Sequence, residues 1–174
     1  MSAEVTYDEL SQWLDGYFQA VNGNQGDLDK VVKLTKYFTA DFQFVMYTRT
    51  KEAFGGPFPQ GPSSRSQLLL LFVHPGLLER LSPQYYVIDL KRMIAVVQFE
   101  VQFFDESTGN ACTPPLQNSA HYHLVLENGD LKITKIQYWT ELPQAPTDEM
   151  YKLWVDSYNK EVAAFALNYI NAHA

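Results

Sequence analysis

The sequence predicts an α+β fold: a cone-shaped, curved mixed sheet, mostly antiparallel, wrapped around N-terminal helices. Apolar residues recur at helical spacing near both ends of the chain, and from Gln84 to Glu141 they alternate with a period of two, as in strands. Helices and antiparallel strands that occupy separate parts of a chain are typical of this class. Because 174 residues is the usual size of one domain, we expect a single domain over 1–174.

Two helices are expected at the N-terminus. Thr6 and Glu9 have the spacing of a capping box, in which side chains satisfy the free amides of the first turn. Asp27 is the expected cap of a second helix, after a Gly-rich break. The predicted buried stripes contain Leu10, Trp13, Leu14, Tyr17 and Val21 in the first helix, and Leu28, Val31, Val32 and Leu34 in the second.

The middle of the chain predicts one strand and short helices. Residues 41–47 alternate as a strand, with Phe42, Phe44 and Met46 on one face. Glycines and prolines make 51–62 a loop, and a capping pattern at 64–67 predicts a short helix through the leucines that follow. His74-Pro75 ends that helix, because proline lacks an amide donor. We expect a one-turn helix around Leu77–Leu81 next.

Four strands and a final helix complete the prediction. The strands are 85–89, 93–105, 119–127 and 131–141. Asn128-Gly129 predicts a tight hairpin, because these residues accept positive φ angles. A longer connection is expected at 106–118. Thr147 caps a last helix that reaches about Asn171, so the core spans about 5–142 and the helical extension about 147–171.

Composition excludes several classes of protein. With 46% hydrophobic and 19% charged residues, the chain is not disordered. Its net charge of −7 and its lack of a Lys/Arg run argue against nucleic-acid binding. The longest apolar run, Leu68–Val73, is too short for a membrane span, and no signal peptide is recognisable, so we expect a cytoplasmic protein. Cys112 is the single cysteine, which excludes an intrachain disulfide and a thiolate zinc cluster.

Several local sequences, taken in this order, resemble the SnoaL-like branch of the nuclear transport factor 2-like superfamily. They are Tyr17 in the first helix, the 26–28 opening of the second, the stretch Tyr37–Phe42, and the closing hairpin Asn128–Trp139. The resemblance covers about residues 5–142. This superfamily includes ketosteroid isomerase, scytalone dehydratase, limonene epoxide hydrolase and polyketide cyclases beside many non-catalytic members, so the fold alone does not imply an activity.

The resemblance suggests where a site would lie. Tyr17 falls where ketosteroid isomerase has its oxyanion-hole tyrosine, and a buried phenol can donate a hydrogen bond to a developing oxyanion. The alternative is that an aromatic ring there only fills the cone. Met46 stands near the place of the isomerase's aspartate and is no base, and Tyr122 stands near its second acid. The expected cavity residues are Trp13, Tyr17, Phe44, Met46, Phe72, Tyr122 and Tyr138.

The two histidines of the 119–127 strand allow three interpretations. Alternation places His121 and His123 on the outer face of the sheet, which in this superfamily often forms a dimer interface. A bulge would instead turn His123 into the cavity as an acid/base, oriented by Glu100. A third hypothesis is a metal site formed by His121, His123 and Glu127, although the geometry of a flat strand suits it poorly.

The sequence therefore favours an apolar pocket for a small organic molecule in a homodimer. If the protein is an enzyme, we expect a cofactor-free isomerase, dehydratase or cyclase with no metal, in which Tyr17 and Tyr138 polarise oxygen and His123 is the candidate base. The alternative is a non-catalytic ligand-binding or protein-interaction member of the same fold, which Met46 favours.

Overall fold

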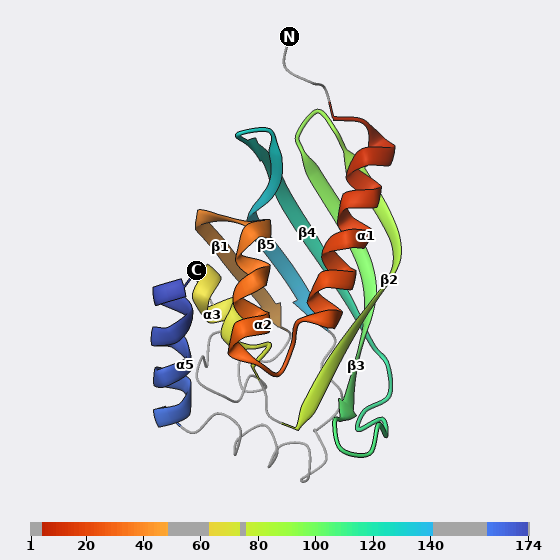
Figure 1. The fold of residues 1–174 in the computed structure, drawn as a ribbon. Helices are drawn as coiled ribbons and strands as arrows, with labels where there is room; N and C mark the ends of the chain where they lie inside the picture. Colours follow the sequence, from red (N-terminus) through yellow and green to blue (C-terminus); the bar gives the residue numbers. More distant parts are fainter. Residues whose placement is uncertain (1–4, 49–62, 74–75, 141–159, 174) are drawn as a thin grey trace.

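The computed structural model describes residues 5–48, 63–73, 76–140 and 160–173. A five-stranded sheet has the order β1-β5-β4-β3-β2, with β1 parallel to β5 and all other neighbours antiparallel (Figure 1). The elements are α1 (Tyr7–Gly23), α2 (Leu28–Val32), a 3₁₀ helix η1 (Lys33–Tyr37), β1 (Phe38–Thr48), α3 (Arg65–Leu70), β2 (Leu77–Asp89), β3 (Ile94–Asp105), β4 (Leu116–Glu127), β5 (Asp130–Thr140) and α5 (Lys160–His173).

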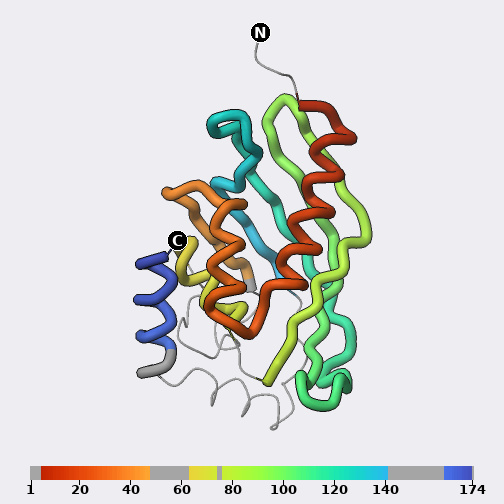
Figure 2. Tube along the Cα trace, in the orientation of Figure 1, coloured from red at the N-terminus to blue at the C-terminus, as the bar shows by residue number. Residues whose placement is uncertain are grey.

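The helices lie over one face of the twisted sheet, and the core lies between the two layers (Figures 1 and 2). Helix α1 contacts β2, and α5 lies beside α2 and α3. Along β3 every second residue from Ala95 to Phe103 is buried, and these side chains point toward the helices. We call this helix-covered face the inner face and the opposite one the outer face. The mixed α+β cone predicted from the sequence is confirmed.

The predicted caps and hairpin are present. Thr6 and Glu9 form the complete capping box of α1, and Asp27 caps α2 by accepting a hydrogen bond from the Asp29 amide at 2.8 Å. Asn128 and Gly129 have φ angles of 55° and 92° in the β4–β5 turn. These elements depend on neighbouring residues only, which is why the sequence predicts them well.

One predicted element is wrong: residues Leu77–Leu81 form the start of β2 and not a one-turn helix. They pair antiparallel with β3, from Leu77 opposite Asp105 to Leu81 opposite Val101. Leu77 and Leu81 are buried, whereas Leu78 and Arg80 are exposed. Leucine favours helices when only local propensity acts, but pairing and burial against a distant strand outweigh a difference of a few tenths of a kcal/mol per residue.

Other boundaries differ by a few residues. The second helix ends at Val32 and continues as η1, and β4 begins at Leu116, so the connection after β3 is shorter than predicted. Ser64 caps α3 through the Gln67 amide, but the Gln67 side chain accepts from the Ser63 amide and so does not close a capping box. The expected 51–62 loop, the His74-Pro75 helix end and the Thr147 cap lie outside the described residues.

Candidate functional site

Tyr17 lies at the centre of a buried aromatic cluster on the inner face. Its side chain is 2% exposed. The ring stacks on Trp13, with centroids 6.2 Å apart, and meets the rings of Tyr37 and Tyr122 edge-on at 5.3 and 5.8 Å. Such offset and edge-to-face contacts are favourable for aromatic pairs. The structure therefore places Tyr17 in the interior of the protein.

Tyr122 and Tyr138 also point inward, as the strand alternation predicts. Tyr122 is buried, and its ring meets Phe18 edge-on at 5.9 Å. Tyr138 on β5 packs between Phe44 and Phe99, with both pairs of centroids 5.8 Å apart. One continuous group of rings thus joins the phenols of α1, β4 and β5.

The remaining residues expected in the cavity belong to the same core. Phe44 and Phe72 are buried, and Trp13 and Met46 are partly buried against them. Met46 lies opposite Tyr138 in the sheet register and has no group that can take a proton. The structure brings these residues together; contact with a ligand remains a proposal.

Glu79 is the inner-face residue that the sequence analysis missed. It lies on β2 between the buried residues Leu77 and Leu81, opposite Phe103. The Gln25 side chain holds its backbone: Gln25 Nε2 donates to the Glu79 carbonyl at 2.5 Å, and the Glu79 amide donates to Gln25 Oε1 at 2.8 Å. These two bonds act as a substitute for the next strand at the edge of the sheet, so the position of Glu79 is well defined.

The electrostatics of the inner face couple Glu79 to the tyrosines. Removal from water raises the pKa of the Glu79 carboxyl to about 7, because burial disfavours the charged form. Burial, and then the charge of Glu79, raise the pKa of Tyr17 and Tyr138. The pKa of Tyr122 is also raised, first by burial and then by the neighbouring phenols, with Glu79 as the smallest contribution. At neutral pH this face therefore presents hydrogen-bond donors around an acid that can hold or release a proton.

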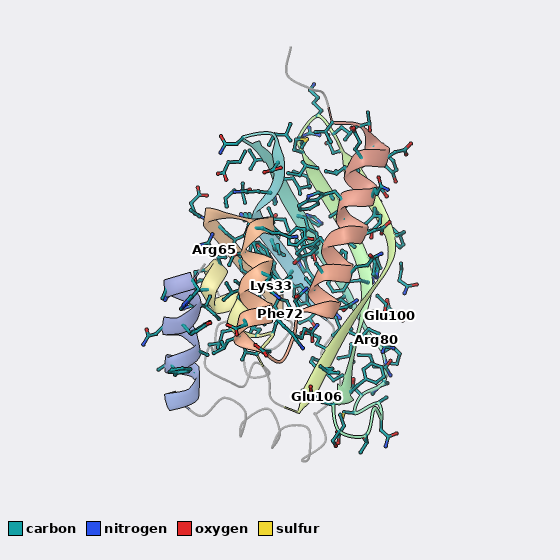
Figure 3. All side chains as sticks on the ribbon, in the orientation of Figure 1. Lys33, Arg65, Phe72, Arg80, Glu100 and Glu106 are labelled. Carbon is teal, nitrogen blue, oxygen red and sulfur yellow. The ribbon has the colours of Figure 1, made fainter. Side chains whose placement is uncertain are left out.

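A pattern in the sequence could have revealed Glu79. On a strand, every second side chain points to the same face. Glu79 would therefore share a face with Leu77 and Leu81, which is the buried one, and Arg80 would point to the other. Arg80, the next residue, points outward and lies over the Phe104 ring at 4.5 Å; Figure 3 labels it beside Glu100 at the margin of the molecule. Assigning this segment to a helix concealed that alternation.

His121 and His123 lie on the outer face, away from Tyr17 and Tyr138. The His121 ring contacts Trp139 at 4.5 Å between centroids, and His123 Nε2 is 2.9 Å from Gln137 Oε1. The β4–β5 pairing has a register shift, but the extra residue is Thr134 on β5, so alternation along β4 is kept through His123. The hypothesis of His123 as a base in the cavity is therefore not supported by its position.

The surroundings of these histidines also differ from those expected. Glu100 does not orient His123: its carboxylate accepts from Gln117 Nε2 at 2.7 Å. The strand partners of His121 and His123 on β3 are Val96 and Ile94. Removal from water, and then the charge of His123, lower the pKa of His121.

The hypothetical metal site is not assembled. Within the described residues, no three side chains of His, Cys, Asp or Glu are arranged to hold a metal ion, and this includes His121, His123 and Glu127. The Glu127 carboxylate is paired with Lys132 across the hairpin. Strand alternation keeps the histidines on a flat surface, and the acid at the turn is occupied by its own partner.

One hollow in the described surface lies away from these residues. It is located between the start of α1 and the β2–β3 turn and is lined by residues such as Val5, Leu90, Met93 and Leu126. None of the candidate site residues lines it.

The described residues also include no helix that is long and apolar enough to cross a membrane.

Comparison with solved structures supports the fold. A candidate calcium/calmodulin-dependent protein kinase II association domain from Xanthomonas campestris matches with a TM-score of 0.57 and 14% identity, over 83% of this chain and 94% of its own. An NTF2-like protein of unknown function from Burkholderia pseudomallei matches with a TM-score of 0.51 and 15% identity, over 83% and 95%. A candidate polyketide cyclase, also from Xanthomonas campestris, has a TM-score of 0.51 and 14% identity, over 86% and 96%.

The chain therefore has the fold of NTF2-like proteins, which is the fold that the sequence resemblance predicts. No protein-family model and no curated protein sequence matches it. At these identities the neighbours show the fold alone, so the function has to be argued from the inner face itself.

Proposed function

We propose that the protein binds a small, largely apolar organic molecule against the inner face of the sheet and transfers a proton on it without a cofactor. Glu79 is the acid/base in this proposal, and Tyr17 and Tyr138 are the hydrogen-bond donors. The reaction class is that of an isomerase, dehydratase or cyclase, in which a proton leaves carbon while negative charge develops on oxygen.

The pKa of Glu79 is the observation that carries the proposal. A general base works best when its pKa lies near the working pH, because it is then both available and strong enough. A carboxyl at its ordinary pKa of 4.5 is a weak base, whereas burial raises the pKa of Glu79 to about 7. A buried acid with a shifted pKa beside several polar groups is a typical feature of active sites.

The phenols supply the second requirement. Tyr17 and Tyr138 have raised pKa values because of burial, so they stay protonated at neutral pH and can donate to an oxyanion. The rings around them, including Phe44 and Phe99, favour an apolar ligand over a phosphate or sugar.

A base-promoted elimination tests this proposal without knowledge of the natural ligand. In 5-nitrobenzisoxazole, a base removes the proton from C3, the N–O bond breaks, a nitrile forms and the phenolate oxygen keeps the electron pair. We expect the full-length protein to accelerate this reaction, with a rate that rises with pH to a plateau and has its midpoint near pH 7. Absorbance of the cyanonitrophenolate product gives the rate.

The matched variants are Glu79→Gln and His123→Gln, which remove the inner-face acid and the outer-face imidazole respectively. We expect Glu79→Gln to lower the rate by about a hundredfold, the lower range for general base catalysis, and His123→Gln to leave it unchanged. The reverse result would assign the base to the outer face. Equal rates in both variants and in the unaltered protein would refute catalysis by Glu79.

The alternative function is non-catalytic binding or assembly. It is favoured by Met46, which stands where the related isomerases are expected to have their base, and by the dense packing of rings around Tyr17. One structural neighbour carries the name of an association domain, so this fold also suits assembly. An absence of rate acceleration together with tight ligand binding would favour this alternative.

We further propose that the protein is a homodimer that associates through the outer face. Large apolar side chains are exposed there: Tyr47 is 43%, Tyr85 57% and Val87 59% exposed. Tyr85 and Val87 are neighbours on one face of β2, whereas Tyr47 stacks on Trp139 at the β1 edge of the sheet. Exposed apolar patches are typical of interfaces. A second copy of the chain is the partner that we favour, because the same exposed rings on two copies can pack against one another across a two-fold axis.

A further inference from the structure

A buried amide on the inner face has an unused hydrogen-bond acceptor. Asn118 on β4 is 2% exposed. Its Nδ2 donates to the Leu116 carbonyl at 2.9 Å, but within the described residues its Oδ1 has no hydrogen-bond partner. Buried polar side-chain atoms almost always have a partner, so an exception of this kind needs a physical explanation.

The orientation of the amide follows from its one hydrogen bond. If the oxygen and nitrogen exchanged places, Oδ1 would face the Leu116 carbonyl, and two acceptors would repel each other. The bond to Leu116 therefore fixes which end of the amide is held by the backbone. The free end is an acceptor, and only a donor can satisfy it.

The strand register places this acceptor next to the proposed site. Asn118 lies opposite Thr140 on β5, and Ala120, two residues further along the same face, lies opposite Tyr138. Residues related diagonally across neighbouring strands are about 7 to 8 Å apart at Cα, within reach of a small ligand. The inner face thus combines a donor at Tyr138 with an acceptor at Asn118.

We infer that Asn118 Oδ1 accepts a hydrogen bond from the ligand, which is therefore an apolar molecule that carries a neutral O–H or N–H group. This inference rests on the proposed binding of an organic molecule at the inner face, and it narrows the ligand class. A pure ketone or hydrocarbon would leave Oδ1 unpaired, and a carboxylate would meet it with a second acceptor. Asn118 selects the ligand in this scheme and takes no part in moving the proton.

The test uses two probes that differ only in the donor, 2-naphthol and 2-methoxynaphthalene. Their affinities for the full-length protein are measured by calorimetry. We expect 2-naphthol to bind at least tenfold more tightly, since a site built to pair a hydroxyl rejects an analogue without one. In Asn118→Leu we expect this preference to fall below twofold. In His123→Gln, on the outer face, we expect the preference to be kept.

A second measurement does not depend on the folding of any variant. With ¹³C-labelled unaltered protein, 2-naphthol should shift the Asn118 side-chain carbonyl resonance and 2-methoxynaphthalene should not. Equal affinities for the two probes, or a preference that survives in Asn118→Leu, would overturn the inference while the proposed binding function stands. Failure of both probes to bind would overturn both. A preference for 2-naphthol in unaltered protein that shows no elimination activity would overturn the catalytic proposal alone.

Discussion

Neutralising Glu79 should remove a large dependence of stability on pH. The unfolded chain has the ordinary Glu pKa of 4.5, whereas the folded protein holds the Glu79 proton up to about pH 7. Below pH 4.5 both states are protonated. Between pH 4.5 and 7 the unfolded state loses the proton while the folded state keeps it, so the free energy of unfolding falls as the pH rises. Above pH 7 both states are ionised, and the full cost of the buried charge remains.

The size of this effect follows from the two pKa values. The interval from 4.5 to about 7, at about 1.4 kcal/mol for each pH unit, corresponds to about 3 kcal/mol. A domain of this size has a total stability of about 5–15 kcal/mol, so the change is easily measured. Because glutamine is similar in shape and carries no charge, we expect Glu79→Gln to be more stable than the unaltered protein at pH 8. Its unfolding free energy should also lack the part of the pH dependence that comes from the Glu79 carboxyl.

Urea unfolding followed by tryptophan fluorescence at pH 5, 6, 7 and 8 measures the effect. The quantity of interest is the difference in unfolding free energy between the unaltered protein and Glu79→Gln, because other titrating groups cancel in that difference. Glu100→Gln, on the outer face, is the matched control and should give a curve parallel to that of the unaltered protein. If the unfolding free energies of Glu79→Gln and the unaltered protein also changed in parallel with pH, the Glu79 carboxyl would not be desolvated, and its raised pKa would be refuted.

Two further predictions concern Tyr17 and the outer face. Tyr17→Phe should lower the elimination rate by about ten- to a hundredfold, because the hydroxyl donor is lost. The free energy of unfolding in urea should change by less than about 1 kcal/mol, because the ring contacts remain. An unchanged rate would exclude Tyr17 as a donor to the oxyanion. Val87→Lys should convert a dimer into a monomer in sedimentation velocity, because it places two like charges in the proposed interface. Lys91→Glu, near the β2–β3 turn, is the control and should remain a dimer. Unaltered protein that sediments as a monomer would rule out the dimer.

The fold was largely predictable because its signals are local or periodic. The Thr6 capping box, the Asn128-Gly129 turn and the alternation along β4 each depend on residues close together in sequence. Alternation also predicted that Tyr122 would face the core and that His121 would face outward. The same periodicity made the alternative role for His123 depend on a bulge in its own strand. The observed register shift instead leaves Thr134 of β5 without a partner, and β4 alternates without interruption, so His123 stays on the outer face.

The candidate site was predicted only in part. Tyr17, Tyr122 and Tyr138 were recognised because they lie in elements with clear periodicity, but Glu79 was not, because its segment reads as a leucine-rich helix in isolation. Its true environment depends on Gln25, more than fifty positions away, and on pairing with Phe103. Such contacts leave no trace in the local sequence.

The order of helices and strands, the inward-facing aromatic residues and the acidic net charge were determined by the sequence itself, since each depends on composition or on short-range spacing. The tertiary structure alone decided which carboxyl is removed from water and which amide oxygen is left without a partner. Desolvation depends on every side chain packed around a group, and Glu79 and Asn118 acquire their properties only when β2, β3 and β4 come together under α1.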